Sequence, residues 1–166
     1  RRMITIGAAL PDATLTESIQ FGDSCPMPPA KLSVAAESKG KTIVVFGLPG
    51  AYTPTCSSKH VPGYLEHREA LLAKGVDEIW CVAVNDGYVM AAWGRDQKAI
   101  GKLRMLGDGS AELAKKLGLD VEIPGMGVRV KRFSLLAVDG VVKQLNVEAP
   151  GKFDVSNAET MLAQLG

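Results

Sequence analysis

The sequence predicts one α/β domain in which a mixed central β-sheet carries helices on both faces. Short apolar, β-branched runs typical of strands covered on both sides alternate with amphipathic helical segments, and a later pair of apolar runs flanks a tight-turn dipeptide. The 166 residues suffice for about one ordinary domain, and 46% hydrophobic against 22% charged residues excludes a disordered or low-complexity chain.

The first third of the chain predicts an edge strand, a loop, a buried strand and a helix. Alternating apolar residues over 13–21 are typical of a half-exposed strand at the sheet edge. Residues 22–29 contain three prolines and are expected to form a surface loop. The apolar run 42–48 predicts a central strand, and the apolar stripe over 64–72 predicts the helix that follows it.

The same alternation continues through the middle of the chain. Residues 78–84 repeat the buried-strand pattern, 88–98 favour a helix, and 102–106 favour a short strand. Ser110 is the expected N-cap of a further helix that ends before Gly118.

The C-terminal part predicts a hairpin and a final helix. Strands over 133–138 and 141–147 flank Asp139-Gly140, a pair that accepts the positive φ of a tight turn. Ser156 and Glu159 have capping-box spacing and are expected to begin an amphipathic C-terminal helix. The antiparallel hairpin makes the predicted sheet mixed.

The charge balance argues against nucleic acid or an anionic membrane as a partner. The 19 lysines and arginines and the 18 aspartates and glutamates leave a net charge of +1, too small to attract a polyanion at long range. No apolar run approaches the ~20 residues that span a bilayer, and the N-terminus lacks the apolar stretch of a secretory signal.

Arg1 and Arg2 precede Met3, which resembles a natural start, so the domain is expected to span 3–166 with residues 1–2 as a remnant outside it.

The three cysteines do not predict a disulfide scaffold. Cys25, Cys56 and Cys81 are odd in number, and none belongs to a C-x-x-C pair. We therefore expect the protein to work in a reducing compartment. The cytoplasm is the simplest such compartment, and an organelle is the alternative if a transit peptide has been removed.

Residues 49–60, between the central strand and the next helix, are the candidate site. Such strand-to-helix junctions are where open α/β sheets bind ligands. A cysteine in the first helical turn meets the positive end of the helix dipole, which favours the nucleophilic thiolate, and Cys56 has that position. Thr53 lies close enough for its hydroxyl to bond the sulfur or an oxygen beside it. The competing interpretation is a buried structural cysteine beside a proline-rich turn.

The remaining cysteines and the histidines allow further interpretations. Cys81 lies in mid-strand, where free cysteines act as small hydrophobes. Cys25 is in the loop, where it could pair with an oxidised Cys56 or be an incidental surface thiol. Cys56, His60 and His67 could share a helix face and bind zinc, but a zinc site needs three or four converging ligands and Pro62-Gly63 interrupts the helix. No metal is expected. His60 could also act as a general base for Cys56, although a positional or solvated histidine is the simpler interpretation.

A basic run, 129–132, leads into the predicted strand at Phe133. In strand geometry Arg129 and Lys131 face opposite to Arg132, so only one side can face a site. A solvated charge cluster is the simpler interpretation of the run, and no local feature distinguishes Arg132 as functional.

The stretch P-G-A-Y-T-P-T-C-S over 49–57 closely resembles the active-site motif P-x-x-x-T-x-x-C of the peroxiredoxins, and more narrowly their type II or five-type class. Further matching segments extend the resemblance over nearly the whole chain: 84–86, 93–95, 131–134, 139–140 and 145–148. The resemblance implies a thioredoxin-like fold and a thiol-dependent peroxidase for hydrogen peroxide and organic hydroperoxides. It also implies that the protein pairs as a homodimer.

The resemblance implies roles for four residues. Cys56 would be the peroxidatic nucleophile that becomes a sulfenic acid, Thr53 its hydroxyl partner, Pro49 a shield, and Arg132 the cation over the sulfur. No metal, haem or other cofactor would be needed, because an external thiol completes the cycle.

The chain departs from the family at the resolving cysteine. Residues 153–156 contain no cysteine where vertebrate members have one, while Cys81 resembles the second cysteine of plant type II enzymes. A buried mid-strand sulfur must leave its packing to form a disulfide, and Cys25 lies in a loop without a counterpart in the family. A one-cysteine cycle recycled by glutathione, glutaredoxin or thioredoxin is therefore expected, with Cys81 and Cys25 as possible resolving residues.

Two other functions stay open at this point. The first is a redox-sensing or chaperone-type interaction protein that is switched by oxidation of Cys56. The second is a cysteine hydrolase based on Cys56 and His60. A disulfide reductase is disfavoured, because Lys59 occupies the position at which a C-x-x-C pair needs its second cysteine.

Overall fold

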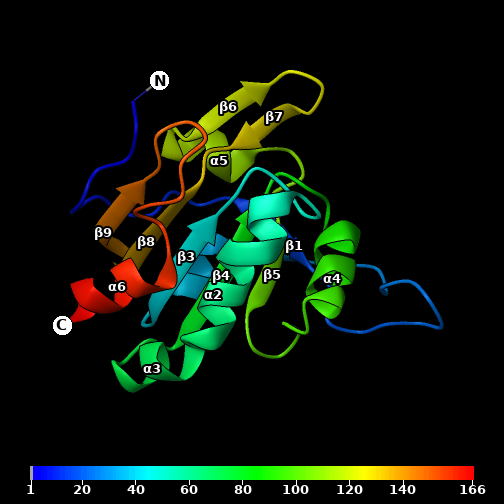
Figure 1. Cartoon of the computed structure of the whole chain (residues 1–166), viewed down its shortest axis with the longest axis horizontal. Helices are drawn as coiled ribbons and strands as arrows, with labels where there is room; N and C mark the ends of the chain where they lie inside the picture. Colours follow the sequence, from blue (N-terminus) through cyan, green and yellow to red (C-terminus); the bar gives the residue numbers. More distant parts are fainter. Residues whose placement is uncertain (1) are drawn as a thin grey trace.

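A computed structural model describes residues 2–166, which form a single α/β domain around a seven-stranded sheet (Figure 1). The strand order is β2-β1-β5-β4-β3-β8-β9. The bounds are β1 (Thr14–Glu17), β2 (Ala30–Ser33), β3 (Thr42–Gly47), β4 (Glu78–Ala83), β5 (Arg104–Gly107), β8 (Phe133–Val138) and β9 (Val141–Val147). Strands β3, β4 and β5 are parallel and the others pair antiparallel, so the predicted mixed sheet is confirmed.

Helices cover both faces of the sheet, as predicted (Figure 1). One face packs against α2 (Val61–Glu66), α3 (Arg68–Ala73), α4 (Gly87–Asp96) and α6 (Ala158–Leu165). The other face packs against α1 (Val34–Ser38) and α5 (Glu112–Leu117). A separate two-stranded hairpin, β6 (Asp120–Ile123) and β7 (Gly127–Val130), lies beyond α5.

The alternation of side chains along β3 divides the core in two. Val44 and Phe46 join the cluster beneath α2 and α4, while Ile43 and Val45 join the cluster beneath α1 and α5. Both faces of β3 are therefore buried, which explains its uninterrupted apolar sequence. Gly47 ends the strand opposite Phe133, and a Cβ there would lie 2.1 Å from the Phe133 ring. Only glycine lets β8 approach this closely.

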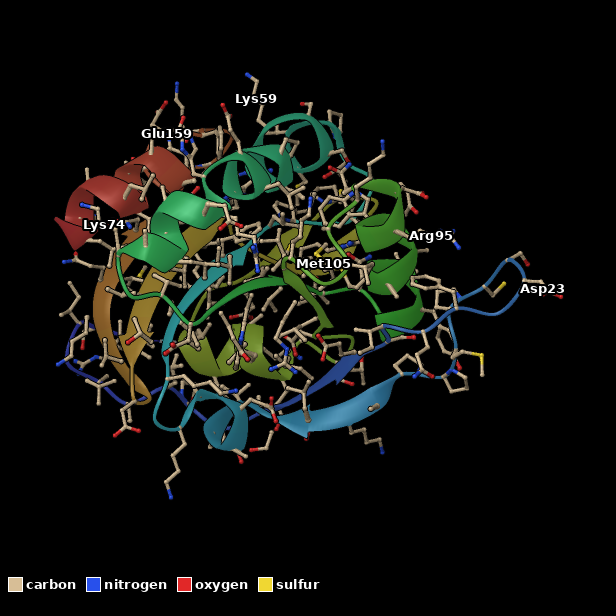
Figure 2. All side chains as sticks on the ribbon, turned by 90° about the horizontal axis from the view of Figure 1, so that it is seen from below. Asp23, Lys59, Lys74, Arg95, Met105 and Glu159 are labelled. Atoms are coloured by element: carbon tan, nitrogen blue, oxygen red, sulfur yellow. The ribbon has the colours of Figure 1, made fainter. Side chains whose placement is uncertain are left out.

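The strand predicted over 13–21 is present but shorter, and its predicted place at the sheet edge was wrong. β1 covers only Thr14–Glu17 and lies between β2 and β5, and the edge is β2. Sequence reasoning missed β2, because its four residues are all at least partly exposed and the run is too short to stand out from the loop before it. The predicted loop between β1 and β2 is present, and Figure 2 shows it projecting from the body of the domain with Asp23 near its tip.

Two predicted helix caps were also wrong. The carboxylate of Asp108 accepts hydrogen bonds from Leu113 N (3.1 Å) and Ala114 N (2.9 Å), so Ser110 does not cap α5. Asn157 caps α6 through Thr160 N (2.9 Å), because the hydroxyl of Ser156 already donates to Glu148 at 2.7 Å. In both helices a carboxylate or amide oxygen of a neighbouring residue accepts from the first-turn N–H groups in place of the expected serine hydroxyl.

The predicted helix over 64–72 is two helices. His67, with ψ 8°, departs from helical backbone and separates α2 from α3.

The β6–β7 hairpin was not predicted. Among residues 2–166 no helix is both long and apolar enough to cross a membrane.

Candidate active site

The candidate site lies where β3 gives way to a helix, as the sequence predicted. Residues 49–53 leave the sheet, the helix begins at residues 54–55, and Cys56 starts the five-residue π-helical turn η1 (Cys56–His60) that continues into α2. The wide turn closes through a hydrogen bond from Val61 N to the carbonyl of Cys56. Cys56 therefore stands at the helix N-terminus, with no exposed surface.

Two residues hold this loop in place, one just after β4 and one at the end of α4. Asn85 accepts a hydrogen bond from Ala51 N through Oδ1 (3.0 Å). Tyr52 adopts a left-handed backbone with φ 62° and donates its hydroxyl to Asp96 at 2.6 Å. This conformation is costly for a residue with a Cβ, so these contacts fix the loop in a shape it would not adopt alone.

Arg132 brings two site residues together. Its Nη2 donates to Cys56 Sγ at 3.2 Å, and its Nη1 contacts His60 Nδ1 at 2.9 Å. A guanidinium in this position can donate a charge-assisted hydrogen bond to the sulfur or to an oxygen bound beside it. The structure therefore brings Arg132 and Cys56 together, while the role that the resemblance implies for Arg132 stays a prediction.

His60 orients Arg132 and does not act on the sulfur. The ring is buried, and its Nε2 lies 3.0 Å from the Ser156 carbonyl oxygen. A carbonyl can only accept, so Nε2 carries the proton and Nδ1 accepts from Arg132. Burial, reinforced by the charge of Arg132, lowers the pKa of His60 to about 3. A ring in this state cannot take a proton from Cys56, which argues against the cysteine hydrolase; His60 is positional and is not solvated.

Thr53 uses its hydroxyl hydrogen within the loop. Its Oγ1 donates to the carbonyl of Gly50 at 2.7 Å, and within residues 2–166 no hydrogen bond joins it to Cys56 Sγ. The lone pairs of Oγ1 are therefore left to accept a hydrogen bond from another molecule.

Arg129 also reaches the loop, contrary to prediction. The sequence argument assumed one continuous strand from Arg129 to Arg132. In the structure β7 ends at Val130 and β8 begins at Phe133, so the side chains of Arg129 and Arg132 need not point to opposite sides. Arg129 Nη1 donates to the Pro49 carbonyl at 3.1 Å. A Cβ on Gly50 would lie 2.7 Å from that same nitrogen, so this glycine makes the approach possible.

Glu148 anchors the segment that carries the Ser156 carbonyl. Its carboxylate accepts from the backbone N–H groups of Asp154, Val155 and Ser156 at 2.8–2.9 Å. Burial alone would raise the pKa of Glu148, but these hydrogen bonds and that of the Ser156 hydroxyl lower it. Glu148, like Asn85, fell within segments that resembled the family, but no local pattern showed its role.

The other two cysteines lie in contrasting places. Cys81 is fully buried in β4 within the same core cluster as Cys56, and burial together with the nearby Cys56 raises its pKa well above the usual value. Cys25 is exposed in the projecting loop, which Arg95 holds through a hydrogen bond to Ser24 O at 3.0 Å. Neither residue is bonded to Cys56 in the structure, so a resolving role for either stays a prediction.

The histidine pair does not converge. His67 Nε2 lies 3.6 Å from Glu159 Oε1 on α6, away from the buried ring of His60. Within residues 2–166 no group of three or more His, Cys, Asp or Glu side chains is arranged to hold a metal ion.

Comparisons with known proteins agree with this geometry. The Redoxin family model matches residues 5–162. Peroxiredoxin-2E-2, chloroplastic, of Oryza sativa is 45% identical over 98% of this chain and 72% of its own length. Reduced Prx3 of Vibrio vulnificus in complex with H2O2 superimposes with a TM-score of 0.91 and 44% identity over 99% of this chain and 100% of its own.

A crystal structure from Burkholderia cenocepacia described as a thioredoxin reductase has a TM-score of 0.94 and 53% identity over 99% of both chains. The present chain has no C-x-x-C pair at Cys56, because residue 59 is lysine. That description therefore does not transfer to this site.

The sheet, its helical layers and the buried cysteine at the strand-to-helix junction define a thiol enzyme on a thioredoxin-like fold. Within that class the chain belongs to the peroxiredoxins, and it is a thiol-dependent peroxidase.

Proposed function

We propose that Cys56 is the residue that reacts with peroxide. Its thiolate attacks the nearer peroxide oxygen in line with the O–O bond, so that an S–O bond forms as the O–O bond breaks. The leaving oxygen takes up a proton and departs as water or an alcohol, and Cys56 becomes a sulfenic acid. The observation that carries this proposal is the 3.2 Å contact between Arg132 Nη2 and Cys56 Sγ.

Arg132 and Thr53 divide the work of positioning and charge stabilisation. The guanidinium stabilises the thiolate and then the negative charge that develops on the leaving oxygen. Thr53 Oγ1, whose hydrogen is bonded to Gly50 O, accepts the peroxide O–H and so turns the O–O bond toward the sulfur. Pro49 lines the approach to Arg132 and limits the entry of water.

No cofactor enters this reaction, and the sulfenic acid is reduced from outside. Two external thiols return Cys56 to the thiol and leave as a disulfide with one water. The burial of Cys81 and the absence of a cysteine in 153–156 support this one-cysteine cycle. We propose glutathione, glutaredoxin or thioredoxin as the reductant, and hydrogen peroxide and organic hydroperoxides as substrates.

We also propose a homodimer and a compartment that supplies reducing thiols. The cytoplasm is the simplest such compartment, and an organelle is the alternative, since relatives of the chain include proteins named chloroplastic and mitochondrial. Nucleic acid and membranes are not proposed as partners.

Turnover distinguishes this function from a redox-sensing interaction protein, which the family assignment does not favour. With excess glutathione and glutaredoxin, or with thioredoxin, the wild type is expected to consume many equivalents of H2O2, and Cys56→Ser none. Cys25→Ser is the control and keeps most of the rate. Consumption that stops at one equivalent with every reductant would contradict the proposal.

A further inference from the structure

A cavity of about 310 Å³ adjoins the candidate active site. It lies between the β6–β7 hairpin and the segment 148–153 after β9, which Figure 1 shows side by side. Pro49, Thr55 and Arg132 form its inner end, beside Cys56. Its size is at the lower limit of small-molecule sites, and it is larger than H2O2 alone requires.

The walls of the cavity are largely hydrocarbon. Val121 and Ile123 of β6 face Pro150 and Phe153 across it. The Phe153 ring also lies 5.8 Å from the guanidinium carbon of Arg132, so the apolar wall continues to the reacting end. Such a surface favours an apolar organic group over a strongly hydrated ligand.

The charge of the cavity is unbalanced. Lys131 and Lys152 line it, and within residues 2–166 neither ammonium group has an ion pair or a side-chain hydrogen bond. The one carboxylate in the lining, Glu148, is occupied by backbone N–H groups and the Ser156 hydroxyl. Arg132 is committed to Cys56 and His60. Two lysines are therefore free to bind an anion.

We propose that this cavity makes the enzyme selective for organic hydroperoxides that carry a carboxylate. Lys131 and Lys152 bind the carboxylate, the apolar walls contact the hydrocarbon, and the hydroperoxide group reaches Cys56 past Arg132. The reaction is the one given above: the S–O bond forms, the O–O bond breaks, and the product alcohol keeps its carboxylate. The inference rests on the proposed function and names the substrate class for that same site.

A pair of matched substrates tests the proposal. Stopped-flow fluorescence gives second-order rate constants for oxidation of the reduced protein by cumene hydroperoxide and by its para-carboxylate analogue, with H2O2 as reference. Two partly exposed ion pairs, from Lys131 and Lys152 to the substrate carboxylate, are expected to make the rate constant for the carboxylate analogue roughly 10-fold higher than that for cumene hydroperoxide. Added salt should reduce this preference. The variant Lys131→Gln/Lys152→Gln is expected to lose this preference and keep the H2O2 rate.

The control variant Lys39→Gln/Lys74→Gln removes the same charge from exposed positions outside the cavity, and it is expected to keep the preference. Equal rates for the two substrates in the wild type, or an undiminished preference in the cavity variant, would overturn this inference alone. Failure of H2O2 to oxidise Cys56 would instead overturn the proposed function, and the inference with it.

Discussion

Arg132 donates to His60 Nδ1 at 2.9 Å, and this contact requires His60 to be neutral. A protonated ring would present an N–H to the guanidinium in place of a lone pair, and two cations would face each other. The lowered pKa of His60 keeps the ring in its accepting form. Because the same guanidinium reaches Cys56, the state of His60 controls where Arg132 points.

His60 makes the stability of the protein depend on pH. Its folded-state pKa of about 3 lies below the usual histidine value of 6.5, so between these values the unfolded chain binds a proton that the folded chain does not. The contribution of His60 to the free energy of unfolding is therefore fully present above the unfolded-state pKa. It is lost as pH falls below that pKa, by about 1 kcal/mol per pH unit. Urea denaturation from about pH 7 to about pH 5 measures this slope.

His60→Gln is expected to flatten that slope, because glutamine can donate and accept but does not titrate. His67→Gln replaces the other histidine of the sequence, which separates α2 from α3 and is partly exposed beside Glu159, and this control variant should keep the slope that the buried His60 causes. Parallel pH profiles for wild type and His60→Gln would contradict the assignment of a neutral buried ring.

Arg132→Lys is expected to slow oxidation of Cys56 by H2O2 by about 100-fold to 1,000-fold, the range for loss of a preorganised donor. A single ammonium cannot reach both His60 and the sulfur, so the substitution is not conservative here. Stopped-flow kinetics measure the effect, with Lys131→Gln as the adjacent control that should keep the H2O2 rate. A rate within a factor of about two of wild type would show that positive charge alone suffices.

Glu148→Gln tests whether the segment 153–156 supports the site. The amide removes an acceptor oxygen from a set of backbone donors, which should lower the free energy of unfolding by about 1–3 kcal/mol. The Ser156 carbonyl then shifts, His60 loses its fixed orientation, and the H2O2 rate falls even under conditions where the protein stays folded. Lost stability with an unchanged rate would limit Glu148 to a structural role.

The parts of this protein that sequence predicts well are local ones. The strands that contain Val45 and Val82 are predicted because their own residues are almost all apolar, as burial on both faces requires. The position of Cys56 follows from the strand before it and the helix after it. The short, half-exposed β2 has no such pattern, and the cap of α5 comes from Asp108, two residues before the expected serine.

The support of the site is not local. Arg132 and His60 are 72 residues apart, and His60 and Ser156 are 96 apart. Nothing near any of them predicts that they meet. The family resemblance supplied Arg132, while the neutral state of His60 and the convergence of Arg129 on Pro49 required the fold.

The most direct test of the account is the intact mass of the protein after one equivalent of H2O2, for wild type and for each Cys→Ser variant. The account predicts the gain of one oxygen in wild type, Cys25→Ser and Cys81→Ser, and no change in Cys56→Ser. An oxygen gained by Cys56→Ser would place the reactive sulfur elsewhere and contradict the account.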